Sequence, residues 1–167
     1  MDLDFLDAVL GATKKISLEG PHGKSSLTFA VPPGVRDGEK IRLRGKGMPG
    51  PGGKAGDLII KIRVKPHERF RRDGDHITTS VGVSFAEAVL GAKVEILTPH
   101  GTTTVSIPPG TQGGQVLRLP GEGVRRKGAP PGDVLVTVKI LVPKNVDEKS
   151  RELIRRFDRA NPVKGQA

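Results

Sequence analysis

Apolar residues alternate with polar or small residues through most of this chain. Leucine, isoleucine, valine and phenylalanine occupy every second position in residues 27–31 and 58–64, and again in residues 105–107 and 134–140. A period of two places one face of a β-strand on a core and the other face in water. Glycine and proline separate these segments, as at the ends of short strands. The pattern therefore predicts an all-β chain.

The second half of the chain repeats the first. Five landmarks recur in the same order, with an offset that drifts only from 80 to 76 residues. The pairs are Phe5–Ala12 with Phe85–Ala92, Pro21–Gly23 with Pro99–Gly101, Val31–Gly34 with Ile107–Gly110, Gly45–Gly47 with Gly121–Gly123, and Gly56–Asp57 with Gly132–Asp133. Such a repeat indicates an internal duplication. We expect two tandem small β-sandwich domains, residues 1–74 and 75–145, with the break near Asp73–Asp75.

Short helices are expected where the strand period is interrupted. The segment Phe-x-x-Ala-Val-Leu-Gly occurs once in each repeat and does not alternate. In the second copy Ser84 and Glu87 have the spacing of a capping box, and Gly91 stands where a helix would end. The sequence therefore predicts one short helix in each domain.

The C-terminal segment has no counterpart in the first repeat. Residues 147–159 contain no glycine or proline, and Asn161-Pro162 follows them as a stop signal. Leu153, Ile154 and Phe157 lie on one face of the resulting helix, between charged residues. We expect residues 146–160 to form a separate helical element.

The composition limits the cellular compartment and the binding partners that we expect for this chain. The 167 residues include no cysteine, which excludes disulfides and cysteine-ligated zinc. No apolar run reaches the roughly 18 residues of a membrane span, and the acidic N-terminus does not resemble a signal peptide. The expected location is the cytoplasm. The net charge of +10 favours an acidic partner, although solubility alone would also explain it.

No arrangement of residues indicates catalysis. Gly45-Lys46-Gly47 lacks the serine or threonine that follows lysine in a phosphate-binding loop. His22, His67, His76 and His100 are not spaced like metal ligands, and no Gly-x-Ser-x-Gly elbow occurs. We expect a protein that is not an enzyme and that uses no metal or cofactor.

An ordered set of motifs resembles one family. After the repeated helix segment and Pro-His-Gly come Val-Pro-Pro-Gly-Val, Ile-Arg-Leu-Arg-Gly-Lys-Gly-Met-Pro, Gly-Asp-Leu-Ile-Ile-Lys-Ile and Phe70-x-Arg72-Asp73-Gly74-Asp75. Together they resemble the tandem C-terminal domains of DnaJ-type J-domain co-chaperones, over residues 2–160. The lack of cysteines between Lys15 and Leu27 is similar to the subclass without a zinc finger, which includes curved-DNA-binding protein A. No His-Pro-Asp tripeptide occurs, so we expect a fragment or a protein without a J-domain, its first strand shortened at Met1.

The resemblance implies that the chain binds unfolded polypeptide. In this family an extended client lies in an apolar groove of the first domain, beside the second strand, by β-augmentation. Ile16 and Leu18 match groove positions on the strand that contains Lys14 and Lys15, and Ile60 matches another on a later strand. The alternative is that these three side chains simply fill the core.

Further partners follow from the same resemblance. In some relatives lysines of the first domain bind the acidic C-terminal tail of a DnaK-type chaperone, and Lys14 and Lys65 occupy the matching positions. The C-terminal helix resembles a dimerisation element, with Leu153, Ile154 and Phe157 as contacts. A homodimer would hold one client at two points. The alternatives are a solvated basic face for the lysines and packing of the helix on its own second domain.

A second class of function competes with the first. The positive charge would suit a protein that binds DNA without sequence preference, through the phosphate backbone and in a salt-sensitive way. Aromatic residues make up only 3% of the chain, and we find no recognition helix or stacking platform. An assembly module that binds no client is a third alternative.

Overall fold

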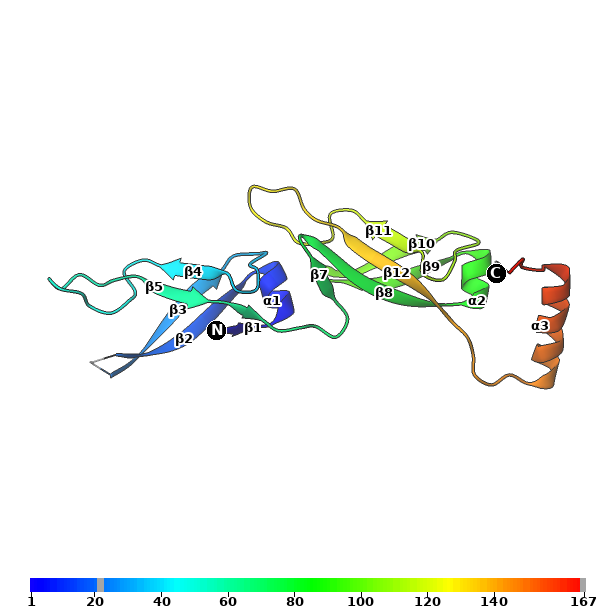
Figure 1. Ribbon diagram of the computed structural model, residues 1–167, viewed down its shortest axis with the longest axis horizontal. Helices are drawn as coiled ribbons and strands as arrows, with labels where there is room; N and C mark the ends of the chain where they lie inside the picture. The colour runs from blue at the N-terminus through cyan, green and yellow to red at the C-terminus, as the bar shows by residue number, and fades with distance from the viewer. Residues whose placement is uncertain (21–22, 166–167) are drawn as a thin grey trace.

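The computed structural model describes residues 1–20 and 23–165, which form two elongated units placed end to end with a helix beyond the second (Figure 1). The first unit contains β1 (Asp2–Leu3), α1 (Phe5–Leu10), β2 (Ala12–Gly20), β3 (Gly23–Val31), β4 (Lys40–Leu43), β5 (Leu58–Lys61) and β6 (Arg63–Val64). The second contains β7 (Arg71–Asp73), β8 (His76–Ser84), α2 (Phe85–Leu90), β9 (Ala92–Thr98), β10 (Gly101–Ile107), β11 (Val116–Leu119) and β12 (Val134–Leu141). Helix α3 (Glu148–Ala160) follows.

The second unit is the more complete sandwich. Its β9–β10 hairpin packs over a four-stranded sheet in the order β11-β12-β8-β7, in which β8 and β12 pair in parallel from Ile77↔Val134 to Ser84↔Leu141. The alternating residues Val134, Val136 and Val138 are fully buried. The expected all-β fold with short helices is therefore confirmed, because period-two segments of this kind bury one face on the opposite sheet.

The first unit repeats this plan with fewer strand pairs. The β2–β3 hairpin faces the β4–β5 pair, and β1 pairs with β6 only from Asp2↔Arg63 to Leu3↔Val64. Leu3 is 1% exposed and occupies the place of Val83 in the second unit. Among residues 1–20 and 23–165, β5 has a strand partner on one edge alone, which is β4.

Both short helices form where the sequence predicts them. The capping box is confirmed, because the Ser84 hydroxyl accepts the Glu87 N–H at 3.0 Å and the Glu87 carboxylate accepts the Ser84 N–H at 2.9 Å. Gly91 ends α2 at φ = 79°, a conformation that glycine adopts without strain. Helix α1 begins after Asp4, whose side chain makes no capping bond.

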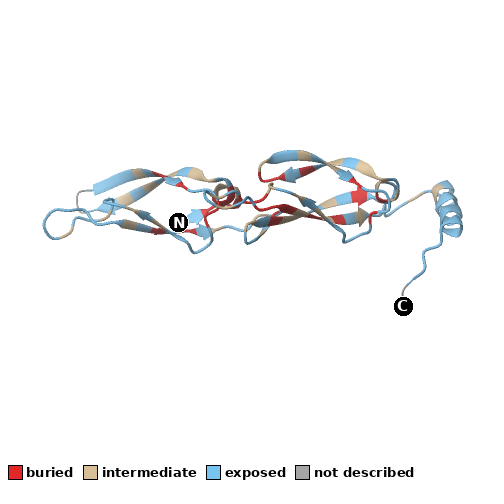
Figure 2. Ribbon diagram, turned by 90° about the horizontal axis from the view of Figure 1, so that it is seen from above, coloured by how far each residue is buried: buried red, intermediate tan, exposed pale blue. Residues whose placement is uncertain are grey.

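Helix α1 joins the cores of the two units. Phe5 and Val9 pack in one cluster with Phe70, which precedes β7, and with Ile77 and Val124 of the second unit, and Figure 2 shows buried segments at this junction. The aromatic rings of Phe5 and Phe70 stack with centroids 6.2 Å apart. Apolar burial of this kind between the units fixes how they sit relative to each other.

Polar contacts reinforce the junction. The Arg72 guanidinium donates to the carbonyl oxygens of Val35 at 2.7 Å and Gly34 at 2.9 Å. Asp75 lies between three guanidinium groups, those of Arg36, Arg72 and Arg126. Strand β7 pairs with β8 across residues 74 and 75, where the sequence predicts the boundary between the two domains. The domain boundary remains a prediction.

Helix α3 stands apart from both sandwiches. It lies within residues 146–160, which were predicted to be helical, and is capped by Asp147, whose carboxylate accepts the Ser150 N–H at 2.7 Å. None of its residues is buried. Across the described part of the chain, no helix is long and apolar enough to cross a membrane.

Candidate functional site

The inner face of the first unit carries apolar side chains that are only partly covered. Ile16 and Leu18 of β2 are half-buried, and Ile16 packs against the core of this unit. Ile60 of β5 is 7% exposed and belongs to that core. Two of the three predicted groove residues thus retain accessible surface, whereas Ile60 is buried in the core. Their role in binding remains a prediction.

The matching positions of the second unit are closed. Counted from the start of each hairpin at Ala12 and Ala92, Ile16 corresponds to Ile96 and Leu18 to Thr98, and both residues of the second unit are 3% exposed. Ile96 packs in one cluster with Ile77 of β8. Ile16 and Leu18, by contrast, retain accessible surface.

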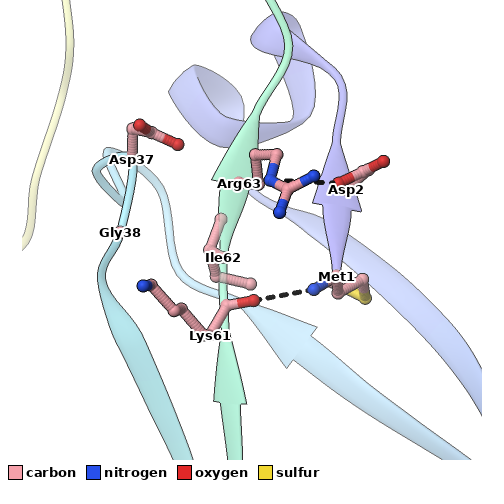
Figure 3. Close-up of a pocket in the computed structure, with 7 residues that line it drawn as sticks. All are labelled: Met1, Asp2, Asp37, Gly38, Lys61, Ile62 and Arg63. Atoms are coloured by element: carbon pink, nitrogen blue, oxygen red, sulfur yellow. Dashed lines mark hydrogen bonds and ion pairs between the residues drawn. The ribbon is translucent and has the colours of Figure 1, made fainter.

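One edge of β5 is hydrogen-bonded to the N-terminal segment at Lys61. Figure 3 shows the bond at the end of the β1 ladder, in which the Met1 ammonium donates to the Lys61 carbonyl at 2.7 Å. The Arg63 N–H donates to the Met1 carbonyl at 2.9 Å. Beyond these bonds, toward Leu58, the edge of β5 has no strand beside it within the described residues, and Ile59 is 51% exposed.

Two depressions lie at strand edges. One of about 380 Å³ adjoins the end of β1 and is lined by Met1, Asp2, Asp37, Gly38, Lys61, Ile62 and Arg63 (Figure 3). The other, of about 410 Å³, lies between β8 and β9 and is lined by residues 79–82 and 95–97 together with Glu68 and Arg69. Both depressions are lined by charged and polar residues together with a few apolar ones.

Each of the two lysines predicted to bind an acidic tail pairs with a carboxylate at the start of α1. The Lys14 ammonium lies 2.5 Å from the Asp7 carboxylate, and the Lys65 ammonium lies 3.1 Å from that of Asp4. The hydrogen bond that the Lys14 ammonium donates to Asp7 is the main cause that raises the pKa of Lys14 above its ordinary value. An incoming acidic tail would have to compete with these two carboxylates.

The predicted dimerisation residues form an exposed apolar stripe. Leu153 and Ile154 are each 55% exposed, and Phe157 is 41% exposed. Phe157 makes an edge-to-face contact with Phe85 of α2, with ring centroids 5.4 Å apart. This contact is partial packing on the second unit, and it leaves most of the stripe uncovered.

The described histidines take part in backbone contacts. The Nδ1 atom of His67 accepts the Arg69 N–H at 3.0 Å, and that of His76 accepts the Asp133 N–H at 3.0 Å. His100 lies in the turn between β9 and β10, as its place between proline and glycine predicts. His22 lies outside the described residues.

Each unit contains an aspartate that holds a backbone N–H and an arginine together, a duplicated carboxylate clasp that was not predicted from the motifs. Asp57 accepts the Gly45 N–H at 2.9 Å and pairs with Arg42, while Asp133 accepts the Gly121 N–H at 3.0 Å and pairs with Arg118. In each unit the backbone N–H is the main cause that lowers the pKa of the aspartate. The signal was the recurrence of all three residue types at an offset of 76. Each clasp fixes the base of a long loop.

Comparison with known proteins identifies the family. The model of the DnaJ C terminal domain matches residues 1–143. The chain is 48% identical to the protein named Chaperone protein DnaJ 2 of Cutibacterium acnes over 134 residues, which are 79% of this chain and 35% of that protein. It is also 48% identical to Chaperone protein DnaJ of Geobacillus thermodenitrificans over 138 residues, 81% of this chain and 36% of that protein.

A third relative extends the range of sequences. Chaperone protein DnaJ 2 of Mycolicibacterium paratuberculosis is 41% identical over 141 residues, which are 84% of this chain and 36% of that protein. The chain spans about a third of the length of the curated relatives it matches. The family match confirms the resemblance seen in the motifs and agrees with the expectation of a protein that is not an enzyme. This chain belongs to the DnaJ C-terminal domain family.

Proposed function

We propose that this chain is a co-chaperone module that binds extended, unfolded polypeptide on the first unit and delivers it to a DnaK-type chaperone. The observation that carries the proposal is the half-buried pair Ile16 and Leu18, whose counterparts Ile96 and Thr98 are closed over. Accessible apolar side chains beside strand edges suit β-augmentation, in which the client backbone pairs with a strand and alternate side chains enter apolar sites. Names of the relatives support a chaperone role.

Two parts of the proposal concern partners. Lys14 and Lys65 lie close enough to the same acidic segment to receive an acidic tail of the DnaK-type partner in exchange for Asp4 and Asp7. The exposed stripe on α3 supports a homodimer, because a solitary helix of 13 residues is marginal in water without a partner surface. The cytoplasmic location also remains a prediction.

Nonspecific DNA binding is the second candidate, favoured by the net charge of +10. Affinity that depends on phosphate contacts falls steeply with salt, whereas apolar client binding is not screened. Binding to duplex DNA at 50 mM and 200 mM salt, beside client protection at both, separates the two. DNA affinity that persists at 200 mM salt with a clear sequence preference would reverse the ranking.

The test of the function is suppression of aggregation. We expect the chain to slow aggregation of a thermally unfolded client without ATP, and not to stimulate the ATPase of a DnaK-type partner because it contains no His-Pro-Asp motif. Equal light scattering with and without the chain would contradict client binding. ATPase stimulation at stoichiometric amounts would contradict the assignment of this chain to the client-binding half alone.

Leu18→Ser is the sharpest variant for this test. Leu18 is half-buried and lies outside the core clusters, so its loss should weaken peptide binding by about 1–3 kcal/mol while the melting temperature stays nearly constant. Ile16→Ser should weaken binding similarly with a somewhat lower melting temperature, because Ile16 also packs on the core. Lys15→Ser, on the outer face of β2, is the control and should change neither.

A further inference from the structure

The charged groups at the junction of the two units are only loosely paired. The Asp75 carboxylate lies 3.5 Å from the guanidinium groups of Arg72 and Arg126 and 3.9 Å from that of Arg36. Charge-assisted N–H···O bonds measure about 2.7–2.9 Å, so none of these contacts is a close hydrogen bond. The Oδ1 atom of Asp75 and the Nε atom of Arg126 are buried and have no hydrogen-bond partner among the described residues. Buried polar atoms without a partner call for a further ligand, such as an ion or a water molecule.

The cluster carries an excess of positive charge. Three guanidinium groups surround one carboxylate. Arg72 is 16% exposed, and its guanidinium already donates to three backbone carbonyl oxygens at 2.7 to 2.9 Å. The pKa of Arg72 is lowered chiefly by burial, and the charges of Arg36 and Arg126 lower it further while Asp75 opposes them. A second anion would relieve the repulsion among these guanidinium groups.

Two of the arginines can donate to such an anion from different units. Arg36 belongs to the first unit, and Arg126 belongs to the loop between β11 and β12 of the second. Apart from their contacts with Asp75, neither guanidinium makes an ion pair or a side-chain hydrogen bond in the described part of the chain. The stem of Arg126 is held in place, because a Cβ atom at Gly34 would lie 2.3 Å from its Cγ atom. Arg36 is 56% exposed and can turn outward to admit a ligand.

The free groups specify the chemistry of the ligand. Guanidinium groups match the geometry of phosphate oxygen atoms, which accept hydrogen bonds. The Oδ1 atom of Asp75 is itself an acceptor, so the ligand must also donate a hydrogen bond. Inorganic phosphate keeps at least one O–H near neutral pH, whereas sulfate keeps none. A phosphate ion therefore fits all three groups, and a sulfate ion does not.

We propose that Arg36, Arg126 and Asp75 form a binding site for inorganic phosphate that bridges the two units. The phosphate oxygen atoms accept from the two guanidinium groups, and the phosphate hydroxyl donates to the Asp75 carboxylate. Bound phosphate joins the first unit to the second and stabilises their relative orientation. The site lies at the junction and does not depend on the client-binding function proposed above.

Isothermal titration calorimetry of the whole chain with potassium phosphate and with potassium sulfate, at equal ionic strength, tests the site. We expect sulfate to bind about tenfold more weakly than phosphate, because it leaves the acceptor oxygen of Asp75 unpaired. Arg36→Gln and Arg126→Gln should each weaken phosphate binding about tenfold. Arg125→Gln is the matched control in the same loop and should change nothing, since its guanidinium pairs with Glu122.

Asp75→Asn tests the origin of the selectivity. The asparagine amide can donate a hydrogen bond, so this variant should bind sulfate as well as phosphate. In the wild type, phosphate should raise the melting temperature more than sulfate does, because an ion that binds only the folded state stabilises it. Sulfate also controls for the general stabilising effect of such anions.

Several results would overturn the inference. These are no phosphate binding by the wild type, equal affinity of the wild type for phosphate and sulfate, and phosphate affinity that Arg126→Gln leaves unchanged. Tighter binding of a phosphoserine peptide than of inorganic phosphate would assign the site to phosphorylated protein and overturn the assignment to the free ion.

Discussion

Helices α1 and α2 carry nearly the same sequence and end in different surroundings. Phe5 of α1 is 7% exposed, between the units, whereas its counterpart Phe85 of α2 is 52% exposed and contacts only Phe157 among aromatic rings of the described chain. Val9 is 1% exposed. The same apolar segment is therefore buried or exposed according to the residues that lie beside it in the fold. The first copy is covered by the second unit, and the second copy remains available to α3 or to another chain.

The glycines that precede strands β5 and β12 differ in their surroundings in the same way. Gly132 lies against β8, and a Cβ atom there would come within 1.8 Å of the Asp75 carbonyl oxygen. At the equivalent Gly56 the nearest atom would be 3.5 Å away. The equivalent glycines are thus tightly packed in the second unit and loosely packed in the first.

The largest expected effect compares the helices. Phe5→Ala should lower the free energy of unfolding by about 4 kcal/mol, because it leaves a cavity between the units. Phe85→Ala should lower it by about 1 kcal/mol or less in a monomer, since that ring is half exposed. Urea denaturation of both variants measures the difference. Equal losses would show that the two copies are packed alike.

The glycines provide the next comparison. Gly132→Ala should destabilise the chain by about 3 kcal/mol, because the added methyl group collides with backbone that cannot move freely. Gly56→Ala is the matched control and should be nearly neutral. Thermal unfolding followed by circular dichroism distinguishes them. A similar drop in melting temperature for both would show that the two glycines are packed alike.

Substitutions in the apolar stripe on α3 test what covers helix α2. Leu153→Asp with Phe157→Asp should convert a homodimer into a folded monomer, because none of the substituted residues is buried within one chain. Light scattering gives the mass, and we expect weaker binding of long clients with little change for short peptides. Arg156→Asp is a charge control on the same helix. A wild-type monomer at high micromolar concentration would remove the dimer, and an unfolded double variant would place the stripe in the core.

Acid titration should show the smallest effect. The pKa values of Asp57 and Asp133 are lowered from 3.8 in the folded chain, so both groups favour the folded state when ionised. Their stabilisation is present above the unfolded pKa and is lost as the pH falls below about 4. Asp133→Asn should flatten the stability profile between about pH 5 and pH 2.5, with Asp57→Asn as the matched variant. A profile that either variant leaves unchanged would show that its clasp contributes nothing.

Much of this protein was determined by local sequence. Period-two alternation gave the strands, as in residues 134–140 of β12, because a strand half buried on a sandwich must present one apolar face. The spacing of Ser84, Glu87 and Gly91 placed α2, since capping involves residues only three or four apart. The duplication gave two related units, and the motifs gave the family.

Tertiary structure alone decided which copies of the repeated surfaces are covered. Ile16 and Ile96 stand in similar patterns, and only the strand across the sandwich determines that one is half-buried and the other 3% exposed. The same holds for Lys14, whose ion pair with Asp7 depends on how α1 sits against β2. Alternation specifies the face that a side chain occupies. Whether that face is covered depends on contacts between segments far apart in the chain, and these follow from packing.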